Sequence, residues 1–397
     1  MPTHVPGPRI AIVGGGIGGL AAAAFLNRSG LRATVYEQAP ALGEVGAGLV
    51  VAPNAVRLLR RLGAMERLLR RAVPLDWGWE FRRWADGRVL SVEKLSGECE
   101  RLYGERTYVV HRADLLDTVK SAVPGDRIRL GARCTSIEER PHGLRLRFAD
   151  GSRAEADVVI GADGVHSVVR STLAEPTPPA YSGICAFRTI VPADDAPDFA
   201  LRPAQTLWLG PGRHFVHYPI NGGQAVNVVA FAPAGDYTDE SWSATATVEE
   251  FHAEFAGWDA RVTDLIAAGG VPGRWALLDR APLRHWSRGR VTLLGDAAHP
   301  MFPFFAQGAA QSIEDAAVLA RCLAASADDP EQALKRYEVL RIARTTCLQQ
   351  ISHDRRDMNH LPDGPEQQAR DAALAGADPL VGNGWIYGYD AEEVPLS

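Results

Sequence analysis

The stretch IAIVGGGIGGLAAAAFL, Ile10 to Leu26, decides the fold of this chain. Its first four residues are apolar and predict a strand, and its alanine-rich half predicts a helix. Between them the glycines follow the spacing Gly14-x-Gly16-x-x-Gly19. In a strand–turn–helix unit the first glycine permits the tight turn, the second lets the backbone approach a pyrophosphate, and the third lets the helix pack closely on the strand. The stretch therefore predicts a dinucleotide-binding unit.

The same stretch is uncharged and follows Arg9, so a signal peptide or a membrane span is the alternative interpretation. It is short for a span, and each glycine costs a helix about 1 kcal/mol relative to alanine. The next strand, Ala33 to Glu37, favours the dinucleotide instead. Glu37 ends that strand about eighteen residues after Gly19, where a carboxylate can bind a pair of ribose hydroxyls.

Composition limits the possible functions. A chain of 397 residues with 46% hydrophobic residues can bury a large core and is expected to form two domains. Its net charge of -6, without a basic block, argues against nucleic acid or an anionic membrane surface as a partner. The five cysteines are far apart, which fits neither a disulfide framework nor a zinc site and is typical of a reducing cytosol. We therefore expect a cytoplasmic protein without a metal.

A second candidate ligand-binding stretch is Arg290 to Leu323, RVTLLGDAAHPMFPFFAQGAAQSIEDAAVLARCL. It predicts a buried strand, a loop rich in proline and aromatic residues, and a helix. Asp296, at the carboxyl end of the strand, could bind hydroxyl groups. The small residues Gly308 and Ala309 leave the first N–H groups of the helix uncovered, which favours an anionic ligand. A flavin offers both kinds of group, although an ordinary strand, loop and helix of an α/β core remains an alternative.

Two more polar residues follow predicted strands of the same domain. The segment Asp157 to Arg170 contains an apolar strand that ends in Gly-Ala-Asp163-Gly, so Asp163 lies at the edge where open α/β sheets bind ligands. Arg112 begins a helix directly after the apolar segment Tyr108 to Val110. Its guanidinium could reach a phosphate or a ribityl oxygen, and the alternative is a surface arginine.

The remaining segments predict a second domain. From Trp77 the aromatic residues alternate, which indicates strands. Between Tyr181 and Trp275 the chain is predicted to be mostly strands in an antiparallel sheet. The strands are expected at Ile184–Val191, Gln205–Leu209, Arg213–Pro219 and Gln224–Phe231. Along the third of them, His214, Val216 and Tyr218 lie on one face, and Phe215 and His217 on the other.

Two helices of this sequence carry several arginines. One is predicted from Ala55 to Leu69 with a solvated basic face, and the other from Tyr337 to His353 with its arginines on the surface. The latter arginines are Arg336, Arg341 and Arg344. The aromatic-rich tail from Leu361 is expected to pack on the body of the protein or on a second subunit.

Three motifs, in this order and at these separations, carry a family resemblance: GGGIGG with Glu37, GADGVHSVVR, and LLGDAAHPM. They resemble the fingerprints of single-component, or group A, flavoprotein aromatic hydroxylases such as salicylate hydroxylase and 6-hydroxynicotinate 3-monooxygenase. The resemblance implies an α/β fold with a Rossmann-like FAD-binding domain on a mostly parallel sheet. A second, antiparallel-sheet substrate domain would complete a protein like p-hydroxybenzoate hydroxylase. The limits would be 1–75, 104–178 and 280–360 for FAD binding, 76–103 and 179–279 for the substrate domain, and 361–397 for the tail.

The resemblance also implies roles for individual residues. The ADP half of FAD would be held by Gly14, Gly16, Gly19 and Glu37. Arg112 would bind the ribityl or pyrophosphate region, Asp163 would lie on the face shared by flavin and nicotinamide, and Asp296 would bind the ribityl chain. The helix start at Gly308 and Ala309 would stabilise an anionic flavin, and Pro303, Phe304 and Gln307 would line the substrate pocket. Members of the group often carry a His-Gln-Gly turn after the proline, whereas this chain reads PFFAQG.

The candidate catalytic pair is His214 and Tyr218, since the resemblance places their strand over the flavin. A single aromatic ring could sit between their tips. His214, whose ordinary pKa is closest to neutral pH, is predicted to take the substrate's hydroxyl proton, and Tyr218 to donate a hydrogen bond to the phenolate or relay the proton. The alternative is that such a histidine only satisfies a backbone carbonyl.

The resulting hypothesis is an enzyme with non-covalent FAD that consumes NADH or NADPH and molecular oxygen. It would hydroxylate a small phenolic ring bearing a carboxylate, with or without an amino group and with or without loss of CO2, through a flavin C4a-hydroperoxide. The protein would be a monomer or homodimer. Oxidation of a larger natural-product scaffold and a non-catalytic flavin-binding regulator are the alternatives. A flavin-dependent halogenase is disfavoured, since Trp77-Gly78-Trp79-Glu80 lacks the Ile-Pro of the halogenase pattern.

Overall fold

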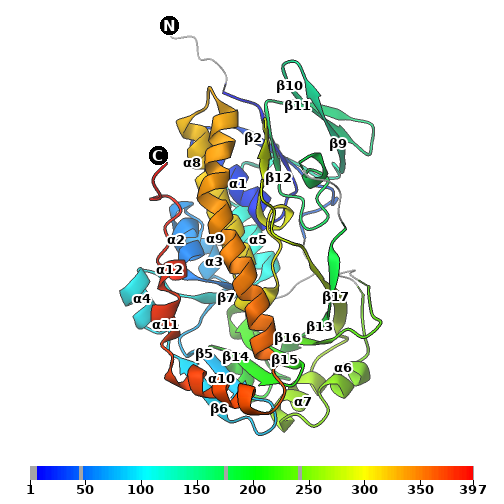
Figure 1. Cartoon of the computed structure of the whole chain (residues 1–397), viewed down its shortest axis with the longest axis vertical. Helices are drawn as coiled ribbons and strands as arrows, with labels where there is room; N and C mark the ends of the chain where they lie inside the picture. The colour runs from blue at the N-terminus through cyan, green and yellow to red at the C-terminus, as the bar shows by residue number, and fades with distance from the viewer. Residues whose placement is uncertain (1–6, 44–47, 174–177, 240–243, 397) are drawn as a thin grey trace.

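A computed structural model describes residues 7–43, 48–173, 178–239 and 244–396 (Figure 1). The described elements form two sheet-based parts along the long axis of the molecule. One long helix, α9 (Pro330–Asn359), runs beside both of them.

The first part is built on a six-stranded sheet with the order β18-β19-β12-β1-β2-β8. Its strands are parallel except β18, and they are β1 (Ile10–Val13), β2 (Ala33–Tyr36), β8 (Ile128–Arg129), β12 (Val158–Gly161), β18 (Ser287–Arg288) and β19 (Val291–Leu293). Helix α1 (Ile17–Arg28) connects β1 to β2, as a βαβ unit requires. The predicted Rossmann-like α/β fold is confirmed.

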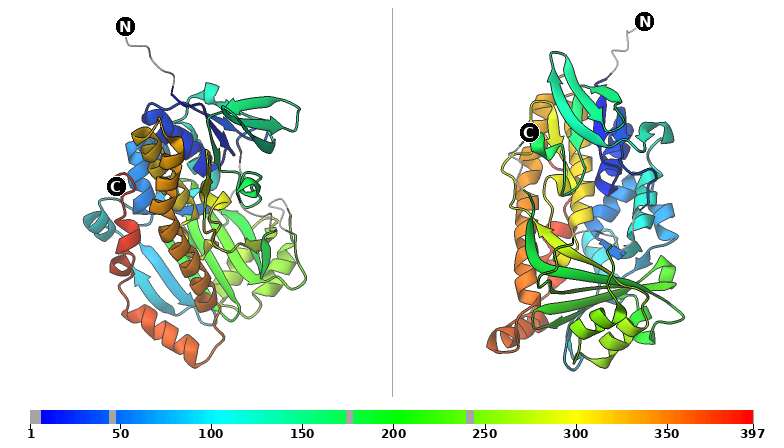
Figure 2. Two further views of the ribbon diagram at one scale, coloured as in Figure 1. Left: turned by 45° about the horizontal axis from the view of Figure 1, so that its top comes forward. Right: turned by 90° about the vertical axis from the view of Figure 1, so that its right-hand side faces the viewer.

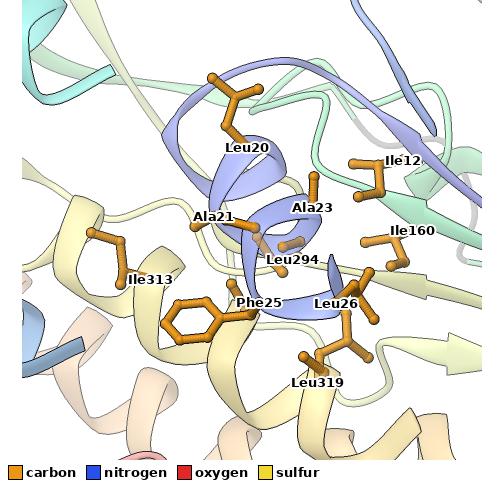
Figure 3. Close-up of a cluster of buried hydrophobic side chains, with 14 of the residues drawn as sticks. Ile12, Leu20, Ala21, Ala23, Phe25, Leu26, Ile160, Leu294, Ile313 and Leu319 are labelled. Atoms are coloured by element: carbon orange, nitrogen blue, oxygen red, sulfur yellow. The ribbon is translucent and has the colours of Figure 1, made fainter. Parts of the chain in front are cut away.

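The core of this part lies between α1 and α8 (Gly308–Ala325) and the sheet (Figure 3). Leu20, Phe25 and Leu26 of α1 are buried together with Ile160 of β12 and Ile313 of α8. Burial of each such side chain contributes about 1.5 to 3 kcal/mol. Nearly every residue from Ile17 to Leu26 is buried, which explains why this helix is apolar on all sides.

Two small sheets extend the first part. One has the order β11-β10-β9, with β9 (Cys134–Arg140), β10 (Gly143–Phe148) and β11 (Arg153–Ala156). The other has the order β3-β7-β4, with β3 (Gly48–Val51), β4 (Val73–Pro74) and β7 (Tyr108–His111), and it leads through β7 into α5 (Arg112–Lys120).

The second part is a seven-stranded sheet with the order β17-β13-β16-β15-β14-β5-β6. Its strands are β5 (Gly78–Arg83), β6 (Val89–Glu93), β13 (Ala180–Pro192), β14 (Ala204–Gly210), β15 (Arg213–Ile220), β16 (Ala225–Pro233) and β17 (Gly273–Asp279). All neighbours are antiparallel except β14 and β5. The predicted second part with an antiparallel sheet is thus present. The residue limits of the two domains stay a prediction.

The sequence predicted mostly strands between Tyr181 and Trp275, and the structure also places two helices there. Helices α6 (Val248–Glu254) and α7 (Ala260–Ala267) cover the outer face of the large sheet (Figure 2). A signal for the first one was present, because Thr247 and Glu250 form a capping box.

The predicted helix Ala55 to Leu69 is two helices, α2 (Pro53–Arg61) and α3 (Met65–Leu69), separated at Gly63 with φ +73°. Its basic face is not simply solvated, which corrects the sequence-based expectation. Arg60 pairs with Glu105 at 2.6 Å, and Arg61 pairs with Asp390 of the carboxyl-terminal tail at 2.6 Å. These arginines therefore fasten other segments to α2.

The tail packs on the body through three helices. They are α10 (Pro365–Gly376), α11 (Pro379–Gly382) and α12 (Gly384–Tyr387), with α4 (Glu98–Tyr103) beside them. Ile386 and Tyr387 are buried, and the ring of Tyr387 contacts that of Tyr103 edge to face. The tail is therefore fastened to α4 by its aromatic contacts and to α2 by the ion pair of Arg61.

All five cysteines are free thiols. Cys347 is exposed on α9, and the other four are buried. None of the helices in the described ranges is long and apolar enough to cross a membrane.

His217 of β15 provides a first prediction, on stability. It is buried under α6 and α7 between Phe199 and Trp208, and neither ring nitrogen has a hydrogen-bond partner in the described part of the chain. Burial, with the charges of Arg82 and Arg202, lowers its pKa to about 3. Between that value and about 6.5 the unfolded chain binds a proton that the folded protein does not, so stability falls as the pH is lowered below 6.5.

We expect His217→Leu to raise the free energy of unfolding. At pH 5 the gain should exceed that at pH 7 by about 2 kcal/mol, at about 1.4 kcal/mol per pH unit below the ordinary pKa. Urea unfolding of wild type and variant at the two pH values measures this difference. His142→Leu, on an exposed hairpin turn, is the control. Equal pH dependence in His217→Leu and wild type would contradict the assignment.

Candidate active site

The glycine motif between β1 and α1 is shaped by close backbone contacts. At Gly14, φ is +106° and an added Cβ would lie 2.3 Å from the carbonyl oxygen of Ala162; at Gly19 it would lie 2.0 Å from that of Gly14. No heavy atom lies within 4 Å of the same position at Gly16, which also begins α1 without a side-chain cap. The backbone here is therefore open to an anionic ligand.

Glu37 lies beside this loop. Its Oε2 accepts a hydrogen bond from the backbone N–H of Gly15 at 2.6 Å, and its Oε1 accepts one from Ala39 at 2.8 Å. The acid is thus held at the end of β2, next to the glycine motif.

Asp163 follows β12 at the same sheet edge, but its carboxylate is used within its own turn. It accepts hydrogen bonds from the hydroxyl of Ser167 and from the backbone N–H groups of Val168 and Val169. Burial raises its pKa, and these hydrogen bonds oppose the shift. Asp163 therefore fixes the shape of the loop after β12.

Asp296 and Arg112 lie near each other, although the chain separates them widely. Asp296 is exposed just after β19, and Arg112 begins α5. Burial lowers the pKa of Arg112, and the charge of Asp296 opposes this effect. The pair offers a carboxylate for hydroxyl groups and a cation for an anionic group.

The start of α8 has no side-chain cap, and its first residues are Gly308 and Ala309. The helix is 18 residues long, so uncovered N–H groups and the positive end of the helix dipole lie at the end of the Phe302 to Gln307 loop. This arrangement fits the predicted anion-binding helix start.

Gln307 is one of the three residues predicted to line a substrate pocket. It is buried, and its Oε1 accepts hydrogen bonds from Asn54 at 3.1 Å and Gln311 at 3.2 Å. Its side chain thus points into a polar network between α2 and α8, because the helix start leaves the amide facing the interior. Of the other two predicted pocket residues, Phe304 is buried and Pro303 is exposed.

The network continues to the arginines predicted on the surface of α9, which corrects that prediction. Arg341 is fully buried and pairs with both Glu314 and Asp315 at 2.7 Å. Arg344 is nearly buried and pairs with Glu314 at 2.8 Å. Asp315 also accepts hydrogen bonds from Nε2 of His299 at 2.6 Å and from the N–H of Gly295 at 3.1 Å, so the network reaches the loop of Asp296.

The strand register places His214 and Tyr218 on the same face of the large sheet, as predicted. His214 pairs with Phe231, and Tyr218 with Asn227. Phe215 and His217 lie on the opposite face, against α6 and α7. The face of His214 and Tyr218 therefore turns toward the first part of the protein.

His214 is held by rings and by a second histidine. It stacks on Phe231 with ring centroids 4.5 Å apart and meets Phe304 edge to face at 5.1 Å. Its Nδ1 lies 2.7 Å from Nε2 of His360. Burial, together with the charge that a protonated His360 would carry, lowers the pKa of His214 well below its ordinary value. Because the side chain is fully enclosed, His214 is neutral at neutral pH.

Tyr218 is also buried, against Gly48 of β3. An added Cβ at Gly48 would lie 2.4 Å from the Tyr218 ring, and the N–H of Gly48 donates a hydrogen bond to Oδ1 of Asn227 at 2.7 Å. Burial raises the pKa of Tyr218, and the nearby charge of Arg188 opposes this effect. The tyrosine therefore stays protonated and can donate a hydrogen bond.

Arg188 is a functional candidate that the sequence reading missed. It lies on β13, is 5% exposed, and its guanidinium lies 4.7 Å from the ring centroid of Trp275. Burial and the charge of Arg112 lower its pKa to about 10, and Tyr218 is close enough to oppose this shift. A lone charge within the apolar run ICAFRTIV was the available signal.

No cluster of three or more histidine, cysteine or acidic side chains within the described ranges could hold a metal ion. The arrangement instead brings together open space at Gly16 of the glycine motif, an exposed carboxylate, an uncapped helix start and a buried basic and aromatic sheet face.

Comparisons with known proteins agree with this arrangement. Residues 8–351 match the family described as FAD binding domain. The chain is 45% identical over 99% of both chains to PtmB3 of Streptomyces platensis, a 3-amino-4-hydroxybenzoate 2-monooxygenase. It is 38% identical to 6-hydroxynicotinate 3-monooxygenase of Pseudomonas fluorescens, over 98% of this chain and 97% of the relative. Among solved structures, Klebsiella pneumoniae HpxO complexed with FAD and uric acid superposes with a TM-score of 0.86, 29% identity and 98% coverage of both chains.

Proposed function

The chain belongs to the FAD binding domain family of flavoprotein aromatic hydroxylases, and we propose that its substrate is an aminohydroxybenzoate of the 3-amino-4-hydroxybenzoate type. It is an FAD-dependent monooxygenase that acts on a small aromatic carboxylate, with NADH or NADPH as the reductant typical of the family.

The site has the features that FAD requires. The open space at Gly16 would accept a pyrophosphate, and Glu37, next to the glycine motif, would bind a ribose. Asp296 and Arg112 would hold the ribityl and pyrophosphate region, with Asp163 shaping the adjacent loop. The uncapped N–H groups at Gly308 and Ala309 would stabilise negative charge on the ring. When bound, FAD supplies a ring that can accept a hydride from the nicotinamide coenzyme and then activate oxygen.

The observation that carries the substrate proposal is Arg188 beside Tyr218 on the buried sheet face. A guanidinium in low dielectric stabilises a carboxylate strongly. The Tyr218 hydroxyl can donate a hydrogen bond to the same ring, and the enclosing aromatic side chains exclude water. His214 would take the proton of the ring hydroxyl, which makes the ring electron-rich.

The proposed function is tested on the FAD-loaded protein with a panel of hydroxybenzoates and aminohydroxybenzoates. We expect 3-amino-4-hydroxybenzoate to stimulate oxygen-dependent NADH or NADPH oxidation and to yield a product one oxygen atom heavier. If another ring gives the stimulation and the product, the substrate proposal is wrong. If no ring does, a larger substrate or a regulatory role becomes the better interpretation.

Arg188→Gln should weaken binding of the aromatic carboxylate by about ten- to a hundredfold, since a hydrogen bond to a charged group contributes about 1.5 to 3 kcal/mol. Binding of FAD and of the carboxylate-free analogue 2-aminophenol should change little. Perturbation of the flavin absorbance on titration measures both affinities. Arg202→Gln is the matched control, because Arg202 also stacks on a tryptophan, Trp77, but is only half-buried. An equal loss for both ligands would point to a structural role.

Asp296→Ala should lower FAD affinity by about tenfold or more, because hydrogen bonds to the ribityl hydroxyls would be lost from a charged acceptor. Fluorescence of released flavin on dilution measures this. Asp328→Ala removes another exposed aspartate, close to the start of α9, and should leave FAD affinity unchanged. Normal retention of FAD by Asp296→Ala would show that Asp296 is only a turn residue.

A further inference from the structure

The hydrogen bond between His214 and His360 assigns a role to a residue in the connection to the tail. Resting on the proposed function, in which His214 takes the substrate's hydroxyl proton, we propose that His360 is a positioning residue. It holds the proton of neutral His214 on Nδ1, so that Nε2 of His214 remains the acceptor.

Two contacts fix this arrangement. Nδ1 of His214 lies 2.7 Å from Nε2 of His360, with the ring centroids 4.9 Å apart. The carbonyl oxygen of His360 accepts a hydrogen bond from the N–H of Gly212, in the turn before β15, at 2.9 Å. His360 is thus tied through its backbone to the start of the strand whose side chain it contacts.

The bond can form with either of two tautomer pairs. If His360 donated from Nε2, neutral His214 would carry its proton on its own Nε2 and could not accept another there. If His214 donates from Nδ1, its Nε2 keeps a free lone pair, and neutral His360 carries its proton on Nδ1. Only the second pair allows His214 to act as a base.

The surroundings leave His360 as the partner that sets the tautomer of His214. The rings of Phe231 and Phe304 enclose His214, so the other polar group beside its ring is His360. The charge of Asp357, on the last turn of α9, raises the pKa of His360, and this opposes the lowering caused by burial. Arg356 and Arg213 are the cations that act on the same ring.

The proton step is balanced within these groups. The substrate O–H bond breaks, an N–H bond forms at Nε2 of His214, and the electron pair stays on the phenolate oxygen. The resulting imidazolium donates its Nδ1–H to Nε2 of His360, which stabilises the positive charge. Burial and Arg356 lower the pKa of His360 to about 4, so His360 is a neutral acceptor at neutral pH.

The test compares His360→Leu with His360→Gln in the FAD-loaded full chain. Leucine removes the acceptor, whereas Oε1 of glutamine can take the place of Nε2. We expect His360→Leu to lower kcat for hydroxylation by about a hundredfold at neutral pH, the lower range for a positioned base, with little change in KM or FAD affinity. His360→Gln should recover most of that loss. His217→Leu, which removes the buried histidine on the opposite face of β15, is the matched control.

A spectroscopic readout separates this role from a structural one. The ionisation of the bound phenol, followed by ultraviolet difference spectra of the oxidised holoenzyme against pH, should move upward by at least one pH unit in His360→Leu. It should stay near the wild-type value in His360→Gln and His217→Leu. Wild-type ionisation and kcat in His360→Leu would overturn the proposal. An equal loss in folded, FAD-retaining His360→Leu and His360→Gln would also overturn it.

The outcome is distinguishable from failure of the proposed function. If no ring in the panel is hydroxylated, the tautomer of His214 can still be read from long-range proton–nitrogen spectra of the chain labelled with 15N-histidine. A protonated Nδ1 and a bare Nε2 in wild type, lost in His360→Leu, support the role of His360. A protonated Nε2 on His214 contradicts it whatever the substrate.

Discussion

His214→Ala is expected to lower ring hydroxylation by about a hundredfold or more while FAD remains bound. The substrate's phenol has an ordinary pKa near 10, so it is mostly protonated at neutral pH and reacts poorly with an electrophilic oxygen. His214 is the enclosed imidazole on the sheet face with Tyr218, and its Nδ1 is already bonded to His360. Without it, more of the NADH or NADPH consumed should appear as hydrogen peroxide.

The loss should be partly recovered at high pH, where the phenol ionises without a base. Tyr218→Phe should reduce hydroxylation less, because it removes a donor and not the base. Rates of product formation and of peroxide release between pH 6 and 10 measure both effects. Wild-type rate and coupling in His214→Ala at neutral pH would move the base elsewhere. The structure already disfavours His217, which lies on the outer face, and His299, whose Nε2 is bonded to Asp315.

Arg341→Met should destabilise the protein by about 3 to 5 kcal/mol, the cost of removing one partner from a buried ion pair. Arg341 is enclosed between Glu314 and Asp315, and its loss would leave two buried carboxylates with less compensation. Burial alone would raise the pKa of Asp315, but the charges of His299 and Arg341 lower it to about 2. Thermal or urea unfolding with FAD removed measures the change.

Arg336→Met is the matched control on the same helix, because Arg336 is half-buried and, among the described residues, its hydrogen-bond partner is the neutral hydroxyl of Ser326, at 3.2 Å. It should cost less than about 1 kcal/mol. Since Asp315 also holds the N–H of Gly295, Arg341→Met should weaken FAD binding as well. Unchanged unfolding in Arg341→Met would mean that the three side chains do not form a coupled unit.

The fold could be predicted where the sequence has a strong local pattern. The glycine motif with Glu37 fixed the first βαβ unit, and alternation in HFVHYP placed His214 and Tyr218 on one face. Helices α6 and α7 were missed because they are short, although Thr247 and Glu250 form a capping box and α7 buries Val262, Leu265 and Ile266 at helical spacing. Arg341 was misplaced because a charged residue at helical spacing usually faces water. The two acids, Glu314 and Asp315, directly before the apolar run Ala316 to Ala320 were the signal that a buried partner was needed.

The sequence was enough to propose which residues would face the cofactor. It was not enough to predict the neighbours or the pKa of the side chains on the large sheet. Asp296, Gly308 and the loop between them all follow strand β19, so their order in the sequence was enough to predict that they lie together. Arg188 and His360 belong to segments distant from β15 in the chain, and only the folded sheet and the end of α9 place them beside Tyr218 and His214. The lowered pKa of His214 likewise depends on enclosure by Phe231 and Phe304, which no local pattern encodes.

Because the five thiols differ in burial, a thiol-reactive label can reach one of them much more easily than the others. Cys347 is exposed on α9, whereas Cys99, Cys134, Cys185 and Cys322 are buried, and burial raises the thiol pKa of these four. A maleimide dye applied under mild conditions should therefore react at one position of the unaltered chain. That position is on α9, which ends at Asn359 directly before His360, so the emission of a single fluorophore there could follow docking of the tail without any engineered cysteine.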